Sequence, residues 1–147
     1  MSIFQKSDIG AQAAWKGFSS QTLYIASRLI SDEGGYEYYP EDIEDLVVKK
    51  NGAIVEAVQV KNISADLTLS SLAATKTSKG GEGFFNRMCS LHAQNPFFHR
   101  IKVVYFNTLG VELQEMQSGK AVTQKALTKR LVDKHGLSES EAVWLID

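Results

Sequence analysis

The chain has 147 residues, of which 44% are hydrophobic and 22% are charged, and its formal net charge is −1. This length and balance suit one folded domain and exclude a disordered or fibrous chain and a pair of independent cores. The single cysteine, Cys89, excludes a disulfide scaffold and a zinc finger. No apolar run reaches the ~20 residues of a membrane helix, and the N-terminus lacks a signal-peptide pattern. We therefore expect a cytoplasmic protein with no membrane partner.

An amphipathic helix is predicted over residues 9–31, because apolar residues recur at three- and four-residue steps and two glycines follow. The expected core-facing stripe comprises Ala14, Phe18, Ile25 and Leu29, with Trp15, Thr22 and Ala26 beside it. Gln21 falls inside this stripe, so its amide should point toward the core and find hydrogen-bond partners there. Those partners belong either to a neighbouring strand or to a functional site, and the pattern does not choose between them.

Three β-strands are predicted next, over residues 36–39, over residues 43–49, and from residue 53 to residue 61, and the last two form a hairpin around Asn51-Gly52. The hairpin should be covered on both sides, because both of its faces are apolar. One face would hold Ile43, Val47, Val55 and Ala57, and the reverse face Leu46, Val48, Ile54, Val58 and Val60.

The length of the hairpin loop decides which polar side chains share a face. A two-residue loop, Asn51-Gly52, places Asp45 across from Val58 and on the opposite face from Gln59. A three-residue loop that starts at Lys50 places Asp45 across from Ala57, on the same face as Gln59 and Lys61. We predict the three-residue loop, because it gathers the polar residues at one end of an otherwise apolar face.

The rest of the chain is predicted to contain helices and one further strand. The expected elements are a short helix at 69–76, a glycine-rich loop at 79–83, a helix at 84–93, a strand at 101–108, a helix at 121–135 and a last helix after Ser138. The strand should be central in its sheet, because it is nearly continuous in apolar and β-branched residues. The chain ends soon after the last helix begins, so we expect residues 1–147 to be a single domain, the N-terminal part of a longer protein.

Charge is segregated along the chain. Residues 31–75 contain nine acidic residues against three lysines, a net charge of −6, whereas residues 76–102 contain five basic residues against one glutamate, a net charge of +4. Such blocks are either two solvated faces of opposite sign or a cation site beside a polyanion-binding surface. The candidate phosphate-binding residues of the basic block are Lys76, Lys79, Arg87 and Arg100.

One polar constellation in the predicted hairpin fits phosphodiester hydrolysis. Asp45 would be the main ligand of a divalent cation, and the amide oxygen of Gln59 or the backbone carbonyl of Val60 a further ligand. Lys61, on the same face as Gln59, would orient the attacking water or neutralise developing charge. The same residue types also occur by chance at the strand ends of many sheet proteins.

Four segments, in this order and spacing, resemble the PD-(D/E)xK nuclease superfamily. They are Lys16–Gln21, Glu41–Val48, Val58–Asn62 and Val103–Thr108. Within the superfamily, the chain is most similar to the double-stranded-DNA endonuclease domain at the N-terminus of bacterial anti-phage effectors, in CBASS systems and in STAND-type NTPase proteins. The likeness covers residues 10–108.

This resemblance implies an α/β, restriction-endonuclease-like fold, in which helices flank a mixed central sheet. It also implies cleavage of double-stranded DNA with Mg²⁺ or Mn²⁺, fusion to a C-terminal sensor or NTPase region, and a homo-oligomer in the activated state. By position, the catalytic set would be Asp45, Gln59 and Lys61, with Gln21 and either Glu41 or Glu44 in support. Gln59 stands where the family often has a second acid.

Two alternatives to an active nuclease remain open. One is a catalytically inactive nuclease fold that serves for nucleic-acid binding or assembly. The other is an unrelated α/β domain whose polar hairpin is coincidental.

Overall fold

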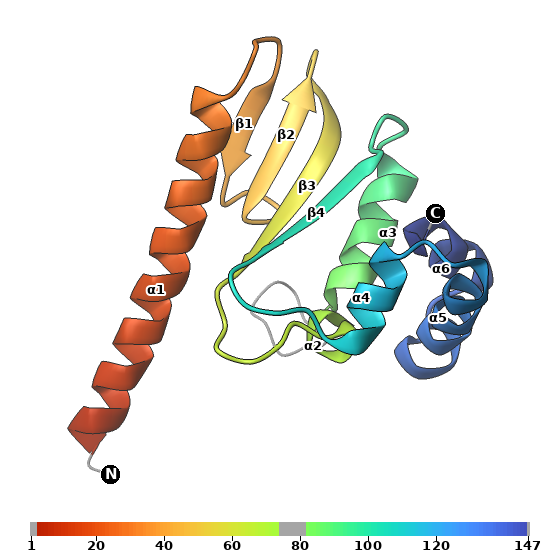
Figure 1. The fold of residues 1–147 in the computed structure, drawn as a ribbon. Coiled ribbons are helices and arrows are strands. Elements are labelled where there is room, and N and C mark those ends of the chain that lie inside the picture. Colours follow the sequence, from red (N-terminus) through yellow and green to blue (C-terminus); the bar gives the residue numbers. More distant parts are fainter. Residues whose placement is uncertain (1–2, 74–81, 147) are drawn as a thin grey trace. The chain divides into compact units, whose positions relative to one another are not determined.

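A computed structural model describes residues 3–73 and 82–146, with side chains from residue 9 onward. The chain groups into two compact units (Figure 1). The first unit contains the N-terminal part of the chain through residue 63 together with residues 97–106, and the second contains residues 64–96 and the C-terminal part from residue 107. The fold is mixed α/β, as the sequence predicts, and each unit is described in turn.

The first unit is built from one long helix and a four-stranded mixed sheet. Helix α1 spans Ile3–Ile30. The strands are β1 (Glu37–Pro40), β2 (Leu46–Lys50), β3 (Ala53–Lys61) and β4 (Arg100–Tyr105), in the spatial order β1-β2-β3-β4. The pairs β1–β2 and β2–β3 are antiparallel, and β3–β4 is parallel. The chain passes through helices of the second unit between β3 and β4.

Helix α1 packs against the sheet only partly through the face that the sequence predicts. Tyr24 and Ile25 contact the buried cluster of Leu46, Val48 and Val58 on the sheet. By contrast, most of the large apolar side chains of the predicted stripe remain exposed. They are Trp15, Phe18 and Leu29, with Ile25 the exception. The face of α1 that packs on the sheet contains polar side chains instead. Each of them has a partner on the sheet or in the adjoining loops.

The hairpin between β2 and β3 turns on two residues, so the predicted three-residue loop is wrong. Asn51 and Gly52 have φ values of 52° and 77°, the pair of left-handed conformations that a type I′ turn requires. The register is Lys49 opposite Ile54 beside the turn, but Val48 opposite Glu56 beyond it. One extra residue in β3 therefore forms a β-bulge and shifts every later pair by one position.

The bulge changes which residues share a face of the hairpin. Beyond it, Leu46 lies opposite Val58, and the same register carried one step further places Asp45 beside Gln59. The predicted shared face of these two residues is thus present, although it is produced by the bulge and not by the turn. Val55 departs from the prediction, because it packs with the Leu46 cluster instead of lying on the opposite face. The strands are buried on both faces, as expected.

Strand β4 lies at an edge of the sheet as described, so its predicted central position is wrong. It pairs with β3 alone, from Arg100 opposite Glu56 to Tyr105 opposite Lys61. Val104 packs against the same cluster as α1. The apolar residues of β4 indicate that its faces are covered, but they do not show how many strands it pairs with.

The second unit is helical. Its elements are α2 (Leu69–Ala73), α3 (Phe84–Gln94), α4 (Val111–Gln117), α5 (Ala121–His135) and α6 (Glu139–Ile146). Helix α5 has the predicted bounds and ends at Gly136, whose φ of 69° is the left-handed conformation common after a helix. Helix α4 was not predicted. The end of the predicted helix 69–76 and most of the loop 79–83 lie outside the described residues.

In the part of the chain that the structure covers, no helix is both long enough and apolar enough to cross a membrane.

Candidate functional site

Asp45, just before β2, meets the end of β3. One carboxylate oxygen, Oδ2, accepts a hydrogen bond from the Gln59 side-chain amide and a second, of 2.7 Å, from the backbone N–H of Val60. Gln59 is only 8% exposed, and Asp45 is half-buried. The structure thus brings Asp45 and Gln59 together, as the sequence predicts. Two donors on one oxygen stabilise the charged carboxylate and fix its direction.

A tight turn from Glu41 to Asp45 carries the carboxylate to this place. The backbone N–H of Glu41 donates to the carbonyl of Asp45 over 3.1 Å, and Glu41 itself has a φ of 53°. A glutamate in the left-handed region is uncommon and is held there by the surrounding contacts. The predicted strand at 43–49 therefore begins only at Leu46, because the turn occupies the residues before it.

Gln21 of α1 ties this turn to the helix. Its amide Nε2 donates to the Glu41 carboxylate and, over 3.2 Å, to the backbone carbonyl of Asp45. Gln21 thus finds its partners in the turn that holds Asp45 and not on a neighbouring strand. Next to it, Ser20 accepts a hydrogen bond from Asn62, directly after β3.

Glu41 and Glu44 occupy different environments. Glu41 is exposed and shares the Gln21 amide with the Asp45 backbone. Glu44 is completely buried. Gln21 thus links Glu41 to the Asp45 backbone.

Lys61 is the last residue of β3 and is half-buried. Because side chains alternate along a strand, it lies on the same face as Gln59, two residues earlier. Asp45, Gln59 and Lys61 are thus gathered at one end of one face of the hairpin.

The predicted phosphate-binding residues do not lie in one unit. Lys76 and Lys79 lie outside the described residues. Arg87, on α3, donates to the backbone carbonyl of Glu82, and its guanidinium lies over the ring of Phe84. Arg100, on β4 of the other unit, donates to Glu56. The basic block of the sequence is therefore divided between the two units.

The candidate donors for a cation are oxygen atoms. They are the carboxylates of Asp45 and Glu41, the amide oxygen of Gln59 and the carbonyl of Val60. Because the N–H and C=O of one strand residue point toward the same neighbour, the Val60 carbonyl is on the Asp45 side of β3. No cluster of three His, Cys, Asp or Glu side chains suited to a metal occurs within residues 9–73 and 82–146. Any cation held here would therefore need amide and backbone oxygens beside the carboxylates.

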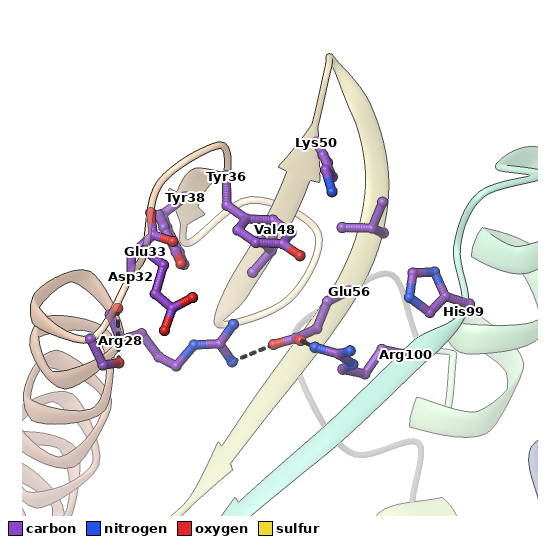
Figure 2. Close-up of a pocket in the computed structure, with 12 residues that line it drawn as sticks. Arg28, Asp32, Glu33, Tyr36, Tyr38, Val48, Lys50, Glu56, His99 and Arg100 are labelled. Atoms are coloured by element: carbon purple, nitrogen blue, oxygen red, sulfur yellow. Dashed lines mark hydrogen bonds and ion pairs between the residues drawn. The ribbon is translucent and has the colours of Figure 1, made fainter.

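A pocket of about 410 Å³ opens on the other face of the same sheet (Figure 2). Glu56 lies in it between two arginines, and Tyr36 and Tyr38 form part of its wall. Since Glu56 and Gln59 are three residues apart on β3, their side chains project from opposite faces. The pocket is thus separate from the Asp45 site.

Sequence reasoning missed the charged group in this pocket. The carboxylate of Glu56, 2% exposed, accepts hydrogen bonds from Arg28 of α1 at 2.6 Å and from Arg100 of β4 at 3.1 Å. Burial is the largest single effect and lowers the pKa of Arg28, but the hydrogen bonds to Glu56 and Tyr24 and the charge of Glu56 together raise the pKa above its ordinary value. Strand alternation could have revealed this group, because it places Glu56 on the same face of β3 as Val58 and Val60, the face that packs against α1.

No protein-family model, no curated protein and no solved structure matches this chain. The functional reading therefore depends on the geometry of the Asp45 site.

Proposed function

We propose that this chain is a metal-dependent endonuclease domain that hydrolyses phosphodiester bonds in double-stranded DNA. The observation that supports this proposal most directly is the meeting of Asp45, Gln59 and Val60, with Lys61 next along the same strand. A carboxylate, an amide, a backbone carbonyl and an ammonium group at one strand end are the components that the reaction needs.

The donor set fits a hard divalent cation such as Mg²⁺ or Mn²⁺. Magnesium is commonly bound through one or two carboxylates and substrate phosphate, and keeps several waters. Asp45 and the Val60 carbonyl would hold it, and a half-turn of the Gln59 amide would present Oε1 in place of Nε2. Such an ion polarises the phosphoryl group and lowers the pKa of a bound water.

Each protein group then has a separate task. Val60 N–H fixes the direction of the Asp45 carboxylate, and the Gln59 amide does so as well until it turns toward a cation. Gln21 holds the turn that presents Asp45, and it also positions Glu41. The Lys61 ammonium orients the attacking water or neutralises the charge that develops on the phosphate. The role of Gln21 is positioning, because it contacts the turn and the supporting acid.

The wider role follows from the same proposal. The mixed sheet with α1 on one face agrees with a restriction-endonuclease-like fold. We propose that the domain acts in the bacterial cytoplasm as an anti-phage effector, joined to a C-terminal sensor or NTPase region and active as a homo-oligomer.

The test is plasmid cleavage by the purified chain with Mg²⁺ or Mn²⁺. Wild type should convert supercoiled plasmid to nicked or linear forms, and Asp45→Ala and Lys61→Ala should each lose at least about 100-fold in rate. Lys49→Ala is the matched control, because Lys49 lies on β2 over the ring of Tyr39, at the turn end of the hairpin. Equal activity in wild type and Lys61→Ala would refute the assignment.

A catalytically inactive nuclease fold is the second candidate. This candidate is favoured because the described side chains include no group of three His, Cys, Asp or Glu residues that could hold a metal. In that case a folded wild type, joined to its activating region and triggered, would bind DNA without cutting it. Phosphate contacts would make the binding strongly dependent on salt in either case.

A further inference from the structure

Helix α1 carries an apolar seam on a face that its own sheet does not use. The seam consists of Ala11, Trp15, Phe18, Thr22 and Leu29, with Ile25 at its edge toward the sheet. Its members are spaced by four and three residues in alternation, which is the repeat by which two helices pack knobs into holes. Trp15 is 70% exposed, Phe18 56% and Leu29 53%.

The contacts that α1 makes with its sheet lie on another face of the helix. Ser20, Gln21, Tyr24 and Arg28 supply them, through Asn62, Glu41, the Leu46 cluster and Glu56 respectively. All four lie in the C-terminal half of α1, and Figure 1 shows its N-terminal half running on past the strands of that unit. The seam is therefore not part of the first unit's own core.

The seam also contains no charged side chain. Between Ile9 and Ser27, α1 contains one charged residue, Lys16. Lys16 is about 100° around the helix from Trp15 and about 160° from Phe18, so it lies away from the seam. A helix face that stays in water normally carries charged side chains. An uncharged seam can face a copy of itself without setting like charges against each other.

The area of the seam suits a second copy of this chain. From residue 11 to residue 29 it is about 27 Å long at 1.5 Å per residue. Trp15, Phe18 and Leu29 with the small residues between them expose on the order of 500 Å² per helix, given roughly 150–250 Å² for each aromatic side chain. Two such seams would bury about 1,000 Å², the lower bound for a specific protein interface. Trp15 and Phe18, whose ring centroids are 6.2 Å apart, form its aromatic centre.

We infer that the exposed seam of α1 is a homodimer interface, at which two copies of this chain pair helix to helix. The inference does not depend on the proposed nuclease activity, because neither Asp45 nor Lys61 belongs to the seam. Because the buried area is at the lower bound for a specific interface, we expect a weak dimer with a dissociation constant of roughly micromolar.

Sedimentation equilibrium of the purified 147-residue chain tests this inference. Wild type should pass from monomer to dimer over a roughly hundredfold concentration range around 10 µM. Trp15→Glu and Phe18→Glu should each weaken the dimer at least about tenfold, because buried aromatic residues dominate such interfaces. Both side chains are exposed on the first unit, so circular dichroism should show both variants folded as wild type.

Two controls make the result specific to the seam. Lys16→Glu changes the same helix away from the seam, and Val122→Glu adds a charge at an 85%-exposed valine on α5. Both should dimerise as wild type. A wild type that is monomeric throughout would overturn the inference, as would a dimer that survives Trp15→Glu. A monomer that binds zwitterionic lipid vesicles through Trp15 would overturn it in favour of a membrane surface.

Discussion

The backbone N–H of Val60 donates a 2.7 Å hydrogen bond to the carboxylate of Asp45, and this bond joins the end of β3 to the turn that precedes β2. The bond gives the Val60 N–H a partner at a point where β2 has not yet begun. It also aims the carboxylate at the face that carries Gln59 and Lys61. Asp45 thus has a structural partner in addition to its proposed chemical role, and variants at this site must be measured for stability as well as activity.

Replacing Gln59 by glutamate separates a cation site from a purely structural hydrogen bond. Without divalent ions, Gln59→Glu should lower the free energy of unfolding by about 1–3 kcal/mol, because a carboxylate then faces Asp45 and the amide donor is lost. Millimolar Mg²⁺ should restore much of this loss and raise the thermal midpoint of the variant more than that of wild type. Gln12→Glu, at an exposed position of α1, is the charge-matched control. If Mg²⁺ stabilises both variants equally, no cation lies between residues 45 and 59.

The two arginines that hold Glu56 should contribute unequally to stability. Arg28 is 20% exposed in its side chain, whereas Arg100 is 55% exposed. Arg28→Ala leaves a buried carboxylate without its closest partner and should cost about 2–4 kcal/mol. Arg100→Ala should cost less than about 1 kcal/mol, because solvent screens an exposed pair. Urea unfolding at pH 7 measures both, and equal costs would contradict the unequal burial of the two pairs.

Two glycine substitutions should have opposite signs. Gly52 has a φ of 77° in the type I′ turn, so Gly52→Ala should destabilise the chain by about 1–2 kcal/mol. Gly10 lies inside α1, and a Cβ added there meets no other atom within 4 Å. Gly10→Ala should therefore stabilise the chain by about 0.5–1 kcal/mol. Thermal unfolding of the two variants is the measurement, and a neutral Gly52→Ala would mean that another turn is used.

The capping box at the start of α6 should make stability depend on acidic pH. The backbone N–H of Ser138 and its hydroxyl donate to Glu141, and these hydrogen bonds lower the pKa of that carboxyl. A lowered folded-state pKa stabilises the fold above the unfolded-state value of about 4.3, and the effect disappears as the pH falls through the lowered value. At pH 7, Glu141→Gln should cost about 0.5–1 kcal/mol.

Measurements at two pH values check this expectation. Urea unfolding of wild type and Glu141→Gln should differ at pH 7, and the difference should shrink as the pH falls through the lowered pKa of Glu141. Glu139→Gln removes a charge from the same first turn of α6 and controls for the helix dipole. A difference between wild type and Glu141→Gln that persists unchanged in acid would contradict the role of the ionised carboxylate.

Local signals in the sequence predicted local structure well. Helix α5 ends at Gly136 as expected, because a glycine in the left-handed conformation is the common way to end a helix. The capping box of Ser138 and Glu141 likewise predicted the start of α6. These features depend on residues within one turn of each other, so the sequence holds the whole interaction.

Features that depend on distant partners were predicted less well. The periodicity of α1 shows an apolar stripe, but it cannot say what covers that stripe. The sheet contacts only the edge of that stripe, at Gln21 and Ile25, and the neighbouring face with Arg28. The partners of Gln21 and Arg28 are Glu41 and Glu56, which are 20 and 28 residues away in the chain. Similarly, the apolar run of β4 could not show that it has one neighbouring strand.

Alternation along strands and an Asn-Gly turn are local properties, so the sequence was enough to assign Asp45, Gln59 and Lys61 to one hairpin. The way in which they meet depends on contacts between strands. The two-residue turn alone would have separated Asp45 from Gln59, and the bulge in β3 returns them to one face. That bulge also gathers Leu46, Val48 and Val58 against α1, and the burial of these side chains is a long-range interaction that no short segment contains.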